Sequence, residues 1–351
     1  MKLLEVRKIW DQAEHNAFTD LIRFKESWFC VLRESSGHTA NDGSLRVITS
    51  DDGETWESAA LIRSSNSDLR DAKITETPEG ELMLCGAESL HDKTHHSHQT
   101  LAWFSKDGRT WSDRHEIADK DFWLWRVSWH KGTAYGVAYS VGNERDNHGF
   151  ARLYASKDGK RFDTLVDNLF DVGYPNESSI IFSGDTAYCL LRRDGQPLHS
   201  DPKSALLGVS EPPYTEWEWK DLGTRVGGPH IIEAADGRLV AAVRIHESED
   251  WHPSHTSLCW IDPEAGKFEE TLRLPSGGDT SYAGLVVHEG ILWVSYYDSR
   301  EGKTSVYLVK VELADQSDGE SSWKRPALRL STKGEGLSQA ILNERDREGL
   351  H

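Results

Sequence analysis

The phrase SDDGETW occupies residues 50–56, and it returns as SKDGRTW at 105–111 and, in a decayed form, as SKDGKRF at 156–162. Serine and aspartate side chains can hydrogen-bond the backbone of a turn, and glycine permits a tight bend. We therefore expect each phrase to form a turn between two strands, with Trp56 packed between neighbouring sheets. This interpretation gives the phrase a role in folding and favours it over a calcium or ligand site built from the aspartates.

A longer repeat surrounds these phrases. Six segments share a polar turn that leads into an apolar run: FKESWFCVLRE, PEGELMLCGAE, HKGTAYGVAYS, SGDTAYCLLRRD, ADGRLVAAVRI and HEGILWVSYYD. Their turns begin at Glu26, Glu79, Lys131, Gly184, Asp236 and Glu289. The spacing is 52 or 53 residues throughout, and a period of roughly fifty residues made of short strands is typical of propeller blades. The sequence predicts an all-β, six-bladed β-propeller of four-stranded antiparallel blades.

One outer strand is missing when the strands are counted in chain order. The last period ends in TSVYLVKVEL, residues 304–313, without a clear partner downstream. LLEVRKIW, residues 3–10, has the length and character of that partner, and pairing the two would remove the last open edge of the ring. We predict one propeller domain over residues 1–314, and a charged tail over 315–351 with a short helix around LSQAILNERD.

Composition narrows the function classes. The 351 residues include 58 acidic and 40 basic side chains, a formal charge of -18, which argues against nucleic acid or an anionic membrane as a partner. We find neither a secretory signal nor an apolar run of membrane-spanning length, and expect a cytoplasmic protein. The four cysteines lie far apart inside apolar runs, which favours buried free thiols: Cys30, Cys85, Cys189 and Cys259.

Strand direction indicates which face of the propeller carries the site. The turns between first and second strands and the repeated phrases fall on one face, so the starts of the first strands and the ends of the second strands meet on the other. The starts of the first strands supply an inner ring: Asp20, Asp71, Arg126, Glu177, His230 and Tyr282. The ends of the second strands add Arg33, Arg192 or Arg193, and Arg244. Because unpaired buried charge is costly, these groups either form a site or pair with one another to seal the channel.

Two near-complete phrases of the form Ser-x-Asp-Gly-x-Thr-Trp between the third and fourth strands of a six-fold propeller resemble the Asp boxes of the sialidase or BNR-repeat superfamily. The resemblance covers about residues 3–313, and the box is one residue shorter here than its familiar form. It implies that Glu177, in PNESS, activates Tyr282, in TSYAGL, as a nucleophile. A phenol needs such a neighbour because its free pKa is about 10. The alternative is that Tyr282 is an ordinary strand aromatic.

The same resemblance implies that arginines hold a substrate carboxylate, with Arg192 or Arg193 and Arg244 as the matching positions. The family's first arginine opens blade one, where this chain reads NAFTDL, residues 16–21, without an arginine. Arg33 or Arg126 could replace it geometrically.

The family's acid aspartate follows the second strand of blade one. In this chain that loop is RESSGHTANDGS, so Asp42 is the nearest match and His38 a competitor. Asp20 and Asp71 are the other candidates for the general acid.

Histidine-rich loops are expected at the same mouth. HDKTHHSHQ starts at residue 91 and IHESEDWHPSH at residue 245, and the histidine spacing matches no recognised metal-ligand pattern. We expect no metal and no cofactor, and interpret His38 and Trp251 as part of a polar, aromatic rim that binds sugar.

Three functions fit these residues. The first is a sialidase-like exo-glycoside hydrolase that acts on an acidic sugar or glycan with Tyr282 and Glu177. The second is a polysaccharide lyase on uronate-containing glycans, and the third is a non-catalytic propeller that binds a glycan or a protein. Three guanidinium groups converging on Tyr282 would favour an acidic sugar, whereas Glu177 and Tyr282 pointing apart would favour binding alone.

Overall fold

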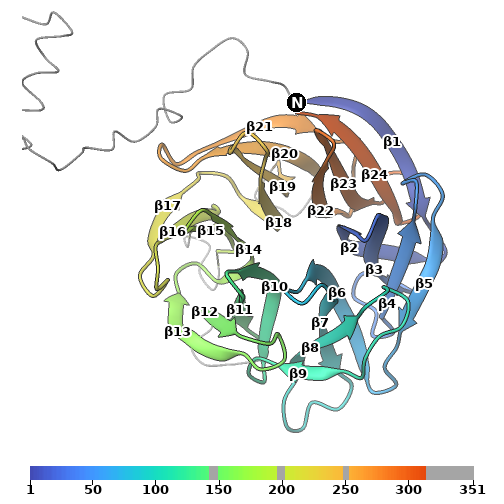
Figure 1. Ribbon diagram of the computed structural model, residues 1–351, viewed down its shortest axis with the longest axis horizontal. Coiled ribbons are helices and arrows are strands. Elements are labelled where there is room, and N and C mark those ends of the chain that lie inside the picture. Colours follow the sequence, from blue (N-terminus) through green and yellow to red (C-terminus); the bar gives the residue numbers. More distant parts are fainter. Residues whose placement is uncertain (142–148, 196–201, 248–252, 314–351) are drawn as a thin grey trace, which may run out of the picture. The chain divides into compact units, whose positions relative to one another are not determined.

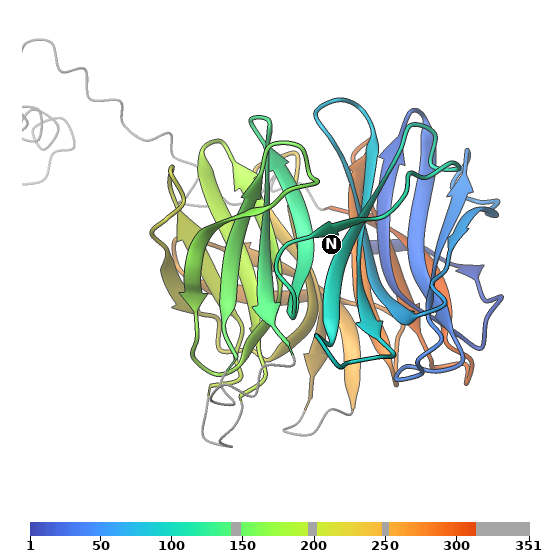
Figure 2. The ribbon, with the colours of Figure 1, turned by 90° about the horizontal axis from the view of Figure 1, so that it is seen from below.

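The computed structural model describes residues 1–141, 149–195, 202–247 and 253–313. The predicted tail over 315–351, its expected helix, and Trp251 lie outside this part of the chain. Within it, 24 strands form six four-stranded antiparallel sheets, arranged as blades around a common axis (Figure 1). Viewed from the side, the strands of each blade run roughly along that axis (Figure 2). The predicted six-bladed β-propeller is therefore confirmed.

Each blade runs from an inner strand to an outer one in chain order. Blade one comprises β2 (His15–Phe24), β3 (Ser27–Ser35), β4 (Ser44–Ser50) and β5 (Glu57–Ile62). Blade two comprises β6 (Ser67–Glu76), β7 (Leu82–Leu90), β8 (His98–Ser105) and β9 (His115–Ile117). Blade three comprises β10 (Phe122–His130), β11 (Thr133–Ser140), β12 (Ala151–Ser156) and β13 (Asp163–Phe170).

The second half of the ring repeats the pattern. Blade four comprises β14 (Pro175–Ser183), β15 (Thr186–Arg193), β16 (Leu206–Ser210) and β17 (Glu218–Asp221). Blade five comprises β18 (Val226–Glu233), β19 (Leu239–His246), β20 (Ser254–Asp262) and β21 (Lys267–Arg273). Blade six comprises β22 (Thr280–His288), β23 (Ile291–Asp298), β24 (Ser305–Glu312) and, as its outer strand, β1 (Lys2–Trp10).

The ring closes through its first strand. β1 lies antiparallel to β24, in a register that pairs Lys2 with Glu312 and Trp10 with Val306 (Figure 1). This pairing is the one predicted from the sequence. It gives the edge of β24 a hydrogen-bonded partner, so blade six has the same four strands as the others.

The repeated phrase forms the expected turn between the third and fourth strands of blades one to three. In the first copy, the Asp52 carboxylate accepts hydrogen bonds from the backbone of Glu54 (2.7 Å) and Thr55 (2.8 Å). Gly53 has φ +74°, and a Cβ there would lie 2.6 Å from the Trp293 ring of blade six. The turn therefore requires glycine for conformation and for close packing, which agrees with a folding role.

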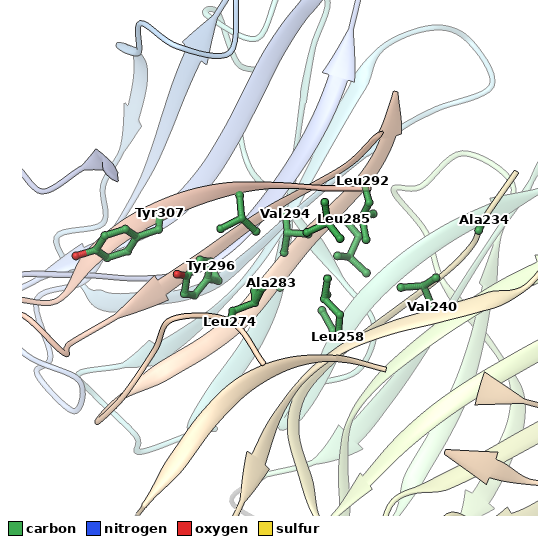
Figure 3. Close-up of a cluster of buried hydrophobic side chains, with 13 residues drawn as sticks. Ala234, Val240, Leu258, Leu274, Ala283, Leu285, Leu292, Val294, Tyr296 and Tyr307 are labelled. Atoms are coloured by element: carbon green, nitrogen blue, oxygen red, sulfur yellow. The ribbon is translucent and has the colours of Figure 1, made fainter. Parts of the chain in front are cut away.

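Hydrophobic clusters lie between neighbouring blades. One of them joins Val240 and Leu258 of blade five to Leu285 and Val294 of blade six (Figure 3). The apolar faces of adjacent sheets thus form a core that continues around the ring. Over the described residues, no helix has the length and apolar character needed to cross a membrane.

Every inner strand carries a register shift against its neighbour. The shifts fall between Ala17 and Asp20, Arg70 and Lys73, Leu124 and Arg126, Pro175 and Ser178, Gly227 and His230, and Ser281 and Gly284. An extra residue in one strand bends it and re-aims its side chains. These shifts decide which members of the predicted inner ring reach the mouth.

Candidate active site

A cavity of about 610 Å³ opens on the face where the inner strands begin. All six blades contribute to its wall: Phe18, His38, Arg70, Asp71, Trp123, Tyr139, Tyr174, Asn176, Glu177, Arg192, Asp194, Arg244, Asp279 and Tyr282. Among the predicted site residues, it brings together Tyr282, Glu177, Asp71, Arg192, Arg244 and His38. The predicted mouth face thus carries a cavity with several charged groups.

Tyr282 and Glu177 are in direct contact at the base of this cavity. The Tyr282 hydroxyl donates a hydrogen bond of 2.5 Å to Glu177 Oε1. Glu177 Oε2 accepts from Arg192 Nη1 at 2.6 Å and from the Gly228 backbone N–H at 2.7 Å. These three contacts fix the carboxylate so that Glu177 Oε1 is in position to accept the phenol proton.

The electrostatic surroundings of this pair keep the proton on the phenol. Burial raises the pKa of Tyr282 well above its usual value, and the charge of Glu177 raises it further. Burial alone would also raise the pKa of Glu177, but the charge of Arg192 and the hydrogen bonds from Tyr282 and Gly228 outweigh it and lower that pKa. The ground state is a neutral phenol beside an ionised carboxylate, the arrangement that a nucleophile with its own general base requires.

Asp71 has the surroundings of a general acid, a group that would complement the Tyr282–Glu177 pair. It sits in the β6 register shift with φ 53°, a conformation rare outside glycine, and its side chain is 8% exposed at the cavity wall. Its carboxyl makes no hydrogen bond with any described residue. Burial raises the pKa of Asp71; Lys73 opposes the shift and the negative charge of Glu177 adds to it. A carboxyl that retains its proton more readily suits a general acid.

Three arginines line the cavity, and each is paired within the protein. Arg192 Nε donates to Asp194 at 2.9 Å, in addition to the Glu177 contact. Arg244 Nη2 lies 3.1 Å from Asp279 Oδ1, and its guanidinium group lies 5.1 Å from the centre of the Tyr282 ring. The third arginine, Arg70, is ion-paired with Asp68. Two of the three guanidinium groups, those of Arg192 and Arg244, therefore contact Tyr282.

A histidine pair surrounds the other oxygen of Asp279. His38 Nδ1 lies 2.6 Å from Asp279 Oδ2, and His15 Nε2 lies 3.2 Å from the same oxygen. Within the described residues, these three form a group whose ligand atoms lie within 4.8 Å of one another, and imidazole and carboxylate are ligands that zinc uses. Asp279 Oδ1 also accepts from the Tyr297 hydroxyl at 2.7 Å, so hydrogen bonds connect the members of this group.

Asp20, Arg126 and His230 do not reach this cavity. They follow the register shifts of their strands and line a second cavity of about 240 Å³ further along. Arg126 Nη1 lies 2.8 Å from Asp20 Oδ2, and His230 Nδ1 lies 3.9 Å from Asp20 Oδ1. Burial and the charge of Arg126 lower the pKa of His230 to about 3. These three residues therefore lie outside the cavity in which they were predicted, in the alternative arrangement where charges pair inside the channel.

Arg33 and Arg193 are likewise outside the cavity. Arg33 is fully buried, and it donates to Asp68 (2.7 Å) and to the Ala40 carbonyl (2.7 Å), which anchors the loop between β3 and β4. Arg193 points to the opposite side of β15 from Arg192 and pairs with Asp221 at 2.6 Å. Their donors hold neighbouring protein groups, and the structure does not bring either of them to the cavity as a replacement for the first arginine.

Asp42 is an exposed residue in the same loop. Its carboxylate accepts the Ser36 backbone N–H at 3.1 Å and does not line the cavity. Among the three aspartates considered for the general acid, the structure therefore favours Asp71 over Asp42 and Asp20.

Several residues that line the cavity were not predicted from the sequence. Phe18 lies in the NAFTDL segment of blade one, with φ 58° and its ring centre 5.0 Å from that of Tyr282. Asp194 follows the Arg192–Arg193 pair and Asp279 precedes the TSYAGL segment, so both were adjacent to predicted residues. Their place next to predicted site residues is the sequence signal for Asp194 and Asp279.

Comparison with known proteins supports the fold. No protein-family model and no curated protein matches the chain. A Dyadobacter fermentans protein of unknown function is similar, with a TM-score of 0.78 and 16% identity over 89% of this chain and 99% of that one. So is a Penicillium chrysogenum α-L-arabinanase, solved with arabinobiose (TM-score 0.69, 13% identity, 89% and 99% covered).

A Trypanosoma rangeli sialidase, solved with sialic acid, is also similar, with a TM-score of 0.65 and 12% identity over 88% of this chain. The chain spans 57% of that sialidase. At these identities the likeness establishes a shared architecture: this chain has the six-bladed propeller fold of sialidases and arabinanases.

Proposed function

We propose that the protein is a glycoside hydrolase in which Tyr282 is the nucleophile, Glu177 its general base and Asp71 the general acid. The observation that carries the proposal is the 2.5 Å hydrogen bond from the buried Tyr282 hydroxyl to Glu177. The cavity that contains this pair is concave, aromatic and polar, as sugar-binding sites are. The arabinanase and the sialidase of the same fold are glycosidases by name.

The groups account for both halves of a retaining reaction. In the first step, Tyr282 Oη attacks the anomeric carbon and its proton passes to Glu177, while the bond to the aglycone oxygen breaks and Asp71 protonates that oxygen. In the second step, water attacks the anomeric carbon, Asp71 accepts the water proton, and Glu177 returns the proton to the departing Tyr282 oxygen. Two inversions give overall retention of configuration.

The other two candidate functions fit less well. A binding-only propeller does not require a buried phenol to donate a hydrogen bond to a carboxylate that already accepts from Arg192 and Gly228. A uronate lyase needs cationic groups available to the substrate carboxylate, and Arg192 and Arg244 are each paired with an aspartate.

The direct test is Tyr282→Phe, assayed with a panel of methylumbelliferyl glycosides that includes sialosides and uronides because the sequence pointed to an acidic sugar. We expect wild type to cleave at least one substrate and the variant to lose about 10³-fold or more in kcat, since a nucleophile has been removed. Tyr296→Phe is the matched control, because it removes a buried hydroxyl that contacts Pro275 away from the cavity. Full turnover by Tyr282→Phe on every cleaved substrate would refute the mechanism.

A further inference from the structure

We infer that the cavity selects a neutral sugar ring as the glycone, in preference to a sialic or uronic acid. The inference rests on the glycoside hydrolase function proposed above and names the substrate class of the same site. It opposes the acidic sugar that the sequence suggested, and it follows from the charges and the aromatic groups of the cavity wall.

The first observation is the charge balance of the wall. Its cations are the three arginines at positions 70, 192 and 244, and its carboxylates are Asp71, Glu177, Asp194 and Asp279. Two buried charges outside the wall offset each other: Asp68, which is ion-paired with Arg70, and Lys73, which acts on Asp71. The described wall thus has no positive excess, even when Asp71 carries a proton. A substrate carboxylate would have to displace an internal ion pair or approach an aspartate, and like charges in contact oppose binding.

The geometry of the ion pairs supports this point. Arg192 uses Nε at 2.9 Å and Nη2 at 3.2 Å in a two-pronged contact with Asp194, and its Nη1 bonds Glu177. Arg244 uses Nε for the Thr280 carbonyl at 2.7 Å and Nη2 for Asp279. In both arginines, the side-on fork formed by Nε and Nη2, with which a guanidinium group can bind a carboxylate, is already occupied by protein groups.

The second observation is the aromatic character of two walls. Phe18 stands on blade one, and its ring packs edge-on against Tyr282 and against His38 at 5.1 Å. On blade three, Trp123 and Tyr139 stack with an interplanar angle of 9°. Flat apolar surfaces suit the C–H faces of a sugar ring, whereas a carboxylate next to Phe18 would lose hydration without gaining a partner.

The carboxylates of the wall can take part in binding as hydrogen-bond acceptors. Asp194 is fixed by Arg192 through both oxygens and by Asn176 through Oδ2, and its Oδ1 keeps lone pairs that can accept a hydrogen bond from a sugar hydroxyl. Charge-assisted hydrogen bonds of this kind are stronger than those between neutral groups. The cavity therefore presents acceptors for hydroxyl groups rather than donors for an acid.

The experiment uses matched pairs of methylumbelliferyl glycosides that differ in one carboxylate: glucoside with glucuronide, and galactoside with galacturonide. Arabinofuranoside, xyloside and sialoside complete the panel. We expect cleavage of neutral members, with kcat/KM at least about 100-fold above any acidic counterpart. A sialoside or uronide cleaved as well as or better than every neutral substrate would overturn the inference and leave the hydrolase function standing.

A positive charge introduced at Phe18 supplies a second test of the inference. Phe18→Arg should move the acidic-to-neutral ratio of kcat/KM towards the acidic member by about tenfold or more, because it adds an unpaired cation to the wall. Phe18→Leu is the control for loss of the ring, and we expect it to leave that ratio within about threefold of wild type because it adds no charge. An equal change in both variants would overturn the inference.

Failure of the proposed function has a different signature. If wild type cleaves nothing in the panel, ligand-observed NMR with free glucose, galactose, arabinose, glucuronate and sialate decides the inference independently of turnover. Saturation transfer to neutral sugars alone would support it. Transfer to the acids, or to no sugar, would overturn it.

Discussion

Replacing Glu177 by Gln should remove catalysis and weaken the fold, because both effects follow from the three contacts of one side chain. Glu177 Oε2 accepts from Arg192 and from the Gly228 backbone, and Oε1 accepts from Tyr282. A glutamine has one acceptor oxygen, which would face the two donors at the Oε2 position. Its NH₂ group would then face the Tyr282 hydroxyl, and the phenol would lose its proton acceptor.

The magnitudes follow from those contacts. Loss of a general base lowers the rate by about 10²- to 10⁴-fold. Hydrogen bonds to a charged group contribute roughly 1 kcal/mol more than neutral ones, so three of them suggest a loss of about 2–3 kcal/mol in the free energy of unfolding at neutral pH. Arg192 keeps Asp194 as a partner, which prevents a larger loss.

The stability effect has a definite pH dependence. The pKa of Glu177 is lower in the folded protein than its usual value of 4.5, so the ionised carboxylate stabilises the fold above about pH 4.5. That contribution is lost as the pH falls through the folded-state pKa. The gap in stability between wild type and Glu177→Gln should therefore narrow in acid.

The assay combines kcat/KM on the best substrate with urea unfolding at pH 7 and at about pH 4, the region where an ordinary glutamate titrates. Glu88→Gln is the matched control: Glu88 is also buried and accepts from Ser67 (2.7 Å) and Arg114 (3.1 Å), but it lies outside the cavity. It should lose stability and keep turnover. Near wild-type activity in Glu177→Gln would refute its role as base, and a stability gap that widens in acid would refute the ionised state.

Two further predictions concern the acid and the loop anchor. Asp71→Asn should slow cleavage of substrates with poor leaving groups by about 10²- to 10⁴-fold and spare those with activated aryl groups. It should also remove the fall in kcat/KM at high pH, because Asp71, whose pKa is raised, loses its proton as pH rises; a retained alkaline limb would contradict this assignment. Arg33→Met should destabilise the protein by about 3 kcal/mol, since Asp68 loses a buried partner but retains Arg70. An unchanged melting temperature would contradict that account.

The sequence predicted the architecture because the repeat is regular, and it failed where a strand departs from regularity. In an unbroken strand, adjacent side chains point to opposite faces, and Arg192 and Arg193 on β15 obey this: one lines the cavity and its neighbour points away. Arg70 and Asp71 do not obey it, because the β6 register shift directs both into the cavity.

The same shifts divided the predicted inner ring. Asp71, Glu177 and Tyr282 lie within the segments where the register shifts, and they reach the mouth. Asp20 and His230 are the first residues after the shifts in their strands, and they face the second cavity. A β-bulge needs no particular residue type, so no local pattern in the sequence placed the shifts. Counting residues back from the turns could therefore predict which residues lie on the inner strands, but it could not predict the direction in which each side chain points.

The closure of the ring by β1 also constrains how the chain folds as it is synthesised. The strand Lys2–Trp10 is made about three hundred residues before its partner Ser305–Glu312. Blades one to five can pair strand by strand, but β1 must wait as an unpaired segment until the last blade is complete. Bringing two such distant strands together is slow for a chain. We expect a nascent or truncated chain that lacks β24 to carry a free β1, open to pairing with a second molecule.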